Sequence, residues 1–102
     1  METKETFGSI INGDKPVLID FYATWCGPCQ YQLPIIDEVA GEIGDGARVL
    51  KVDVDRNQAI SAQLGIRGVP TLMIFKNGEV KWRASGVKDK ATLVALLKEH
   101  GA

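Results

Sequence analysis

The sequence predicts an α/β protein with a mixed four-stranded sheet and helices on both of its faces. Three observations predict this class. Apolar segments with strand character alternate with segments whose apolar residues recur at helical spacing. A helical segment separates the first two strands, which favours a parallel pair with a right-handed crossover. The last two strands flank Asn77-Gly78, a pair well suited to a two-residue hairpin turn, so they must be antiparallel.

The composition is that of one globular domain over residues 1–102, with 45% hydrophobic and 25% charged residues. A net charge of −1, with scattered Lys and Arg, does not indicate binding to nucleic acid or to a membrane surface. The start, METKETFGSI, lacks the apolar segment of a signal peptide, and no apolar run approaches the roughly 20 residues that span a bilayer. We therefore expect a cytoplasmic protein, although a mature exported protein would give the same pattern.

The first half of the chain contains two predicted helices and two predicted strands. Residues 3–11, TKETFGSII, form a short helix with one apolar face. Residues 17–22, VLIDFY, are an almost continuous apolar run, as in a strand covered on both faces. Residues 28–43 have helical periodicity and are followed by Gly44, a residue that commonly ends helices. Residues 47–54, ARVLKVDV, form the second buried strand.

The second half continues with a helix, a hairpin and a last helix. Residues 57–64, NQAISAQL, are a short helix that ends before a glycine. Residues 71–84 contain the two hairpin strands. Residues 89–100, DKATLVALLKEH, are a helix for which Asp89 is the expected N-cap.

Cys26 and Cys29 are the only cysteines and lie in the sequence WCGPC. Four interpretations compete. Structural zinc needs four ligands, and His100 is the only other soft ligand, so we predict no metal site. A structural disulfide across so short a loop would restrict the unfolded chain very little. Two inert buried thiols would not explain the surrounding Trp, Gly and Pro. We therefore favour a redox pair.

A redox pair with this spacing has a physical basis. If the loop leads directly into the helix at residues 28–43, Cys26 lies in the first turn. Unpaired backbone N–H groups and the helix dipole stabilise a thiolate there. Cys29 lies one turn further along, close enough to form a bridge but more buried. We expect Cys26 to be the exposed, activated thiol and Cys29 to be the resolving thiol.

Asp20 is a carboxylate inside a predicted buried strand. An isolated buried carboxylate is unfavourable, so Asp20 should have either a raised pKa or a partner. Such a group could take the proton from Cys29 when that thiol attacks. Lys51, in the middle of the neighbouring strand, is the candidate partner. The alternative is a purely structural Asp20–Lys51 pair within the sheet.

From Pro16 onward the chain resembles the thioredoxin family. The similar segments include DFYATWCGPC, KVDVD and GIRGVPTLMIFKNGE. The resemblance implies the thioredoxin fold and a dithiol–disulfide oxidoreductase that reduces protein disulfides. It assigns Cys26 as the nucleophile, Cys29 as the resolving thiol, Asp20 as the buried acid/base and Lys51 as its neighbour. The Gly-Pro spacer between the cysteines resembles that of the reducing members.

The resemblance also implies a cis bond between Val69 and Pro70 and a groove that binds an extended peptide. It implies thioredoxin reductase as the electron donor and disulfide-containing proteins as substrates. We expect a monomer with no bound cofactor. The groove is expected to consist of Trp25, Gly27, Pro28, Gly68, Val69, Pro70, Gly86 and Val87.

The chain also departs from the family pattern. So few residues precede Thr3 that the usual N-terminal edge strand is expected to be missing or vestigial, leaving four strands and four helices. Tyr22 stands where Trp is more usual, and Gln30 replaces a frequent Lys beside the cysteines. Two other functions remain as alternatives: an exported thioredoxin-like reductant, and a non-catalytic interaction subunit that uses the same groove.

Overall fold

Four strands form one mixed sheet in the computed structural model, which describes residues 6–102. The strand order is β2-β1-β3-β4; β1 pairs parallel with β2 and antiparallel with β3, and β3 pairs antiparallel with β4. This arrangement confirms the predicted sheet. The expectation about an N-terminal edge strand concerns residues outside the described range. The strands are β1 Val17–Tyr22, β2 Arg48–Asp53, β3 Thr71–Lys76 and β4 Glu79–Ser85.

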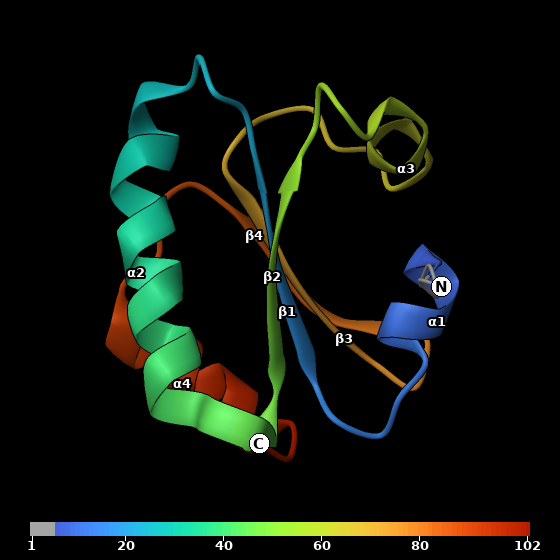
Figure 1. The fold of residues 1–102 in the computed structure, drawn as a ribbon, viewed down its shortest axis with the longest axis vertical. Coiled ribbons are helices and arrows are strands. Elements are labelled where there is room, and N and C mark those ends of the chain that lie inside the picture. Colours follow the sequence, from blue (N-terminus) through green and yellow to red (C-terminus); the bar gives the residue numbers. More distant parts are fainter. Residues whose placement is uncertain (1–5) are drawn as a thin grey trace, which may run out of the picture.

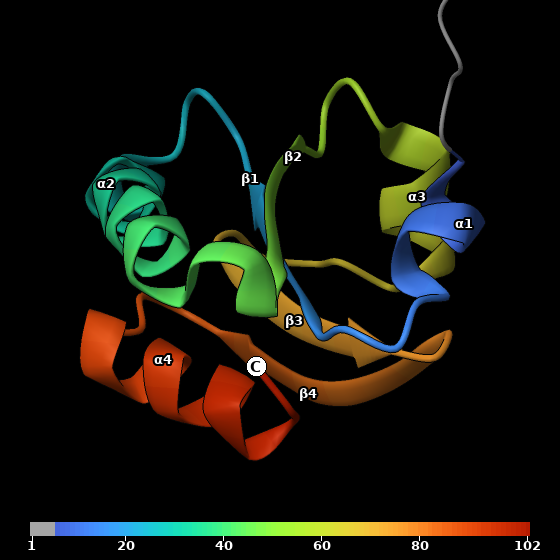
Figure 2. The same cartoon turned by 60° about the horizontal axis from the view of Figure 1, so that its bottom comes forward.

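Helices cover both faces of this sheet, with α2 and α4 on one face and α1 and α3 on the other (Figures 1 and 2). No helix within residues 6–102 has the combination of length and apolar character that crossing a bilayer requires. The helices are α1 Phe7–Ile11, α2 Gly27–Ile43, α3 Gln58–Gln63 and α4 Lys90–Glu99, with a 3₁₀ turn, η1, at Gly44–Gly46.

The side chains of β1 divide the core into two parts. Leu18 packs with residues of α2 and α4, whereas Ile19 and Phe21 pack with residues of α1 and α3. Successive side chains of a strand point to opposite faces. Asp20 therefore points to the face of the sheet that α2 covers, as Leu18 does.

Several helix ends differ from the predicted ones. α1 begins after Thr6, whose hydroxyl accepts a hydrogen bond from the N–H of Ser9, and residues 3–5 of the predicted helix lie outside the described range. α2 begins one residue earlier than predicted, so Cys26 is its N-cap rather than part of its first turn. The side chain of Asp89 caps α4 by accepting from the N–H of Thr92 at 2.8 Å, as predicted.

The hairpin between β3 and β4 turns at Asn77 and Gly78, which have φ angles of 54° and 79°. Positive φ at both central residues is the signature of a type I′ turn, so the structure confirms this prediction. The register contains a bulge that was not predicted, since Ile74 pairs with Trp82 but Phe75 pairs with Val80. One residue of β4 is thus left without an opposite partner.

We predict that Gly78→Ala destabilises the protein, whereas Gly41→Ala, the matched control, does not. Gly78 has a φ angle in the left-handed region, which is unfavourable for a residue with a side chain. A Cβ atom added there would also lie 3.2 Å from Asn12 Oδ1. The free energy of unfolding should fall by about 1–2 kcal/mol. Gly41 lies within α2 with open space around it, so alanine there should raise the free energy of unfolding by about 0.5–1 kcal/mol. Urea unfolding of both variants would contradict this account if they shifted in the same direction.

Candidate active site

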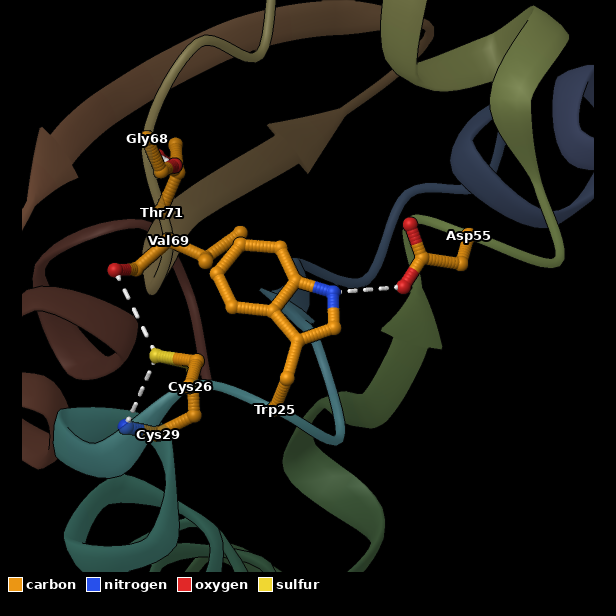
Figure 3. Close-up of a disulfide and its surroundings, with 7 residues drawn as sticks. All are labelled: Trp25, Cys26, Cys29, Asp55, Gly68, Val69 and Thr71. Atoms are coloured by element: carbon orange, nitrogen blue, oxygen red, sulfur yellow. Dashed lines mark hydrogen bonds between the residues drawn. A yellow bond between two sulfur atoms is a disulfide. The ribbon is translucent and has the colours of Figure 1, made fainter.

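Cys26 and Cys29 lie at the N-terminus of α2 and are joined by a disulfide, with their Cα atoms 5.3 Å apart. Cys26 is the N-cap residue, and its Sγ accepts a hydrogen bond from the N–H of Cys29 at 3.2 Å (Figure 3). Pro28 lies in the first turn, where its missing N–H leaves no hydrogen bond unmade. The free N–H groups and the positive end of the helix dipole therefore favour a thiolate at Cys26.

The two sulfurs differ in their access to solvent. Cys26 is 5% exposed and Cys29 is fully buried, so Cys26 is the more accessible of the two, as predicted. However, Cys26 is far less exposed than predicted, because Val54 and Val69 pack against the cysteine cluster. Cys26 borders the neighbouring groove and Cys29 does not. Of the two sulfur-bearing residues, only Cys26 can therefore be reached from the groove.

The groove beside Cys26 has a volume of about 440 Å³. Trp25 is 70% exposed at its rim, and its indole Nε1 donates a hydrogen bond to Asp55 Oδ2 at 2.8 Å (Figure 3). This bond holds the large, exposed apolar surface of the indole in one orientation. The residues that line the groove are Trp25, Cys26, Gly27, Pro28, Val54, Ile66, Arg67, Gly68 and Val69.

A second wall of the site comes from the loop before β3. The Val69–Pro70 bond is cis, as the family resemblance implied. The carbonyl oxygen of Val69 lies 3.6 Å from Cys26 Sγ, a distance at which a protonated thiol donates a hydrogen bond but a disulfide sulfur cannot. Pro70 is buried, and its carbonyl accepts a hydrogen bond from the N–H of Gly86 at 2.9 Å. Gly86 and the neighbouring Val87 are exposed next to this loop.

The structure thus brings most of the predicted groove residues to one place, although Pro70, Gly86 and Val87 lie outside the groove lining itself. Val54 also lines the groove and was not predicted, although the sequence contained a signal for it. Parallel strands such as β1 and β2 end at the same edge of a sheet, so the residue after β2 lies near the loop after β1. The N–H of Val54 indeed donates to the carbonyl of Tyr22 at 2.9 Å. The lining residues that the sequence analysis missed are Val54, Ile66 and Arg67.

Asp20 is fully buried, and neither of its carboxylate oxygens has a hydrogen-bond partner among residues 6–102. Burial raises the pKa of Asp20 from 3.8 to about 7, and the charge of Lys51 lowers it in part. Lys51 lies opposite Asp20 in the β1–β2 register, but its ammonium group pairs with Asp37 of α2 at 2.6 Å. Asp20 thus has the first of the two expected features, a raised pKa, and the direct pairing with Lys51 is replaced by a longer-range effect of its charge.

Comparisons with known proteins agree with this geometry. A family model described as Thioredoxin matches residues 1–99. The thioredoxin of Haemophilus influenzae is 42% identical over 91 residues, which cover 89% of this chain and 85% of the relative. The thioredoxin of Porphyra purpurea is 45% identical over 91 residues, with the same coverage of each chain. The crystal structure of Malassezia sympodialis thioredoxin superposes with a TM-score of 0.84 at 40% identity, covering 94% of this chain and 84% of that one.

We predict that Asp20→Asn stabilises the protein at pH 8 more than at pH 4. Between these pH values the unfolded chain has lost the Asp20 proton while the folded chain still holds it, so wild-type stability falls as pH rises from about 4 to 7. Asparagine does not titrate, so the variant lacks this fall. The stability difference between variant and wild type should therefore be larger at pH 8 than at pH 4, by up to about 4 kcal/mol. Urea unfolding of the oxidised proteins measures it, with the exposed Asp14→Asn as control. Parallel pH curves for Asp20→Asn and wild type would contradict the prediction.

Proposed function

This chain belongs to the thioredoxin family and is a thiol–disulfide oxidoreductase; from that premise we propose how its residues divide the reaction. One observation carries the proposal. Cys26 caps α2 and borders the groove, while the Cys29 sulfur bonded to it is fully buried. The two sulfurs are therefore suited to different steps.

In the first proposed step the thiolate of Cys26 attacks one sulfur of a substrate disulfide. The substrate S–S bond breaks, a mixed disulfide forms, and the second substrate sulfur leaves as a thiolate that takes up a proton. In the second step the thiolate of Cys29 attacks Cys26 Sγ and releases the remaining substrate sulfur. Two electrons thus pass from the cysteine pair to the substrate, and the chain is left as the disulfide seen in the structure.

We propose that Asp20 accepts the proton of Cys29 before the second step. The support is its position on the face of the sheet that α2 covers, its complete burial and its pKa of about 7. At neutral pH about half of such groups are ionised, so one carboxylate can both take and return a proton. Lys51 would tune this carboxylate through its charge, with its own position fixed by Asp37.

We propose that the groove binds an extended segment of the substrate protein. Backbone groups beside Val69 can hydrogen-bond such a segment as an added strand does. Small or apolar residues allow its close approach. The proposed contact residues are Trp25, Gly27, Pro28, Gly68, Val69, Pro70, Gly86 and Val87.

The same proposal extends to partners and location. Electrons would come from thioredoxin reductase, and the substrates would be disulfide-containing proteins of the cytoplasm, where thiols are kept reduced. The chain would act as a single domain over residues 1–102, as a monomer and without a bound cofactor.

Insulin reduction with dithiothreitol as the electron source tests the function. Cys26→Ser should lower the rate to that of dithiothreitol alone, because the nucleophile is lost. Pre-reduced Cys29→Ser, freed of dithiothreitol before insulin is added, should still attack and should accumulate a mixed disulfide at Cys26, because neither Cys29 nor an added dithiol is present to resolve it. Mass spectrometry locates the adduct, and Ser61→Ala is a control outside the site. Activity in Cys26→Ser, or an adduct that accumulates in Cys26→Ser but not in Cys29→Ser, would refute the assignment.

Asp20→Asn should slow the second step and change its pH profile. In the wild type the rate of substrate release should rise as pH increases through about 7, since only the ionised carboxylate accepts a proton. The variant should lose this rise and be slower at pH 7 by about tenfold or more. Lys51→Met should move the rise to higher pH, because it removes the charge that lowers the pKa of Asp20. Rapid-mixing single turnovers of pre-reduced protein with excess disulfide substrate, followed until the substrate thiol is released, measure both effects, and identical profiles would exclude the role.

A further inference from the structure

Gln32 is a fully buried polar residue of α2, one helical turn beyond Cys29. Its Oε1 accepts a hydrogen bond from the backbone N–H of Lys88 at 2.7 Å, and its Nε2 donates one to the backbone carbonyl of Lys88 at 3.0 Å. A buried amide is unfavourable unless it is hydrogen-bonded. Both ends of this amide are satisfied by the backbone of one residue that lies 56 positions away.

The bonded residue belongs to segment 86–88, which lies in the connection between β4 and α4. The segment is held at its start by the bond from Gly86 N–H to the carbonyl of Pro70, and at its end by Gln32. Val87 lies between these two anchors and is 42% exposed. One anchor therefore comes from the loop of the cis proline and the other from the helix that carries both cysteines.

We propose that Gln32 is a positioning residue that fixes segment 86–88 beside the groove, so that Gly86 and Val87 are presented to a protein substrate. The inference rests on the proposed function, in which these two residues contact the substrate chain. It concerns substrates whose backbone extends beyond the reacting sulfur. A small disulfide needs only Cys26 and does not need this segment.

An amide suits this task better than an apolar side chain. Leucine or methionine would fill the space, but the N–H and C=O of Lys88 would lose both partners. Two directional bonds to one peptide unit fix both the distance between α2 and the segment and the register along it. The amide thus specifies where Val87 lies, which packing alone does not.

Gln32→Met, which has nearly the same volume, tests the proposal in pre-reduced protein. For insulin, kcat/KM should fall about tenfold, mostly through KM, because the segment is no longer held. For the small disulfide 5,5′-dithiobis(2-nitrobenzoic acid) the rate should stay within about twofold. Ile36→Val, one turn further along the buried face, is the matched control, since it removes one buried methyl group from the core without touching the segment.

Hydrogen exchange supplies a readout that does not depend on catalysis. The N–H of Lys88 should exchange about tenfold faster in Gln32→Met, while the N–H of Leu93, bonded to Asp89 O within α4, should not change. Val87→Ala, at the surface, gives a second test. It should also raise KM for insulin, and the double variant should lose no more than the larger single loss.

The results separate the two proposals. Equal losses for insulin and the small disulfide, unchanged Lys88 exchange, or additive losses in the double variant would overturn the role of Gln32. Failure of the wild type to reduce either disulfide would instead overturn the proposed function.

Discussion

The hydrogen bond from Cys29 N–H to Cys26 Sγ joins the stability of α2 to the chemistry of the site. Oxygen side chains usually cap helices, and a neutral sulfur is a weak acceptor. A thiolate accepts a charge-assisted bond and also gains from the helix dipole. The helix is therefore best capped when Cys26 is in its reactive form. The rest of the site depends on where this helix begins.

The sheet determines what surrounds that helix start. β1 and β2 are parallel and end at the same edge, and β3 runs antiparallel to β1, so it begins at that edge. The loop with the cysteines, the residues after β2 and the loop with Pro70 therefore meet without any long connection. The Asp55 carboxylate bonded to Trp25, the Cys26 sulfur and the Val69 carbonyl, which are distant in sequence, converge there because the strands are ordered in this way.

Local signals made the hairpin, the redox pair and the raised pKa of Asp20 predictable, because an Asn-Gly pair, the WCGPC spacing and a carboxylate in an apolar run each act over a few residues. Other features depend on partners that are distant in sequence. Lys51 could pair with Asp20 of the neighbouring strand or with Asp37 of α2. Only the packing of α2 on the sheet determines that it pairs with Asp37. Gln32 has the pattern of an ordinary polar helix residue, and its burial follows from where segment 86–88 lies. The bulge in β4 is likewise set by how neighbouring elements meet.

The bulge in β4 affects how readily the edge of the sheet can pair with strands of other chains. β4 is an outer strand of the sheet, and a straight, apolar outer strand invites other chains to add on and aggregate. Here the interrupted register and the charges of Glu79, Lys81 and Arg83 make that border uneven and hydrophilic. The free edge of β4 therefore offers a poor template for the addition of a strand from another chain.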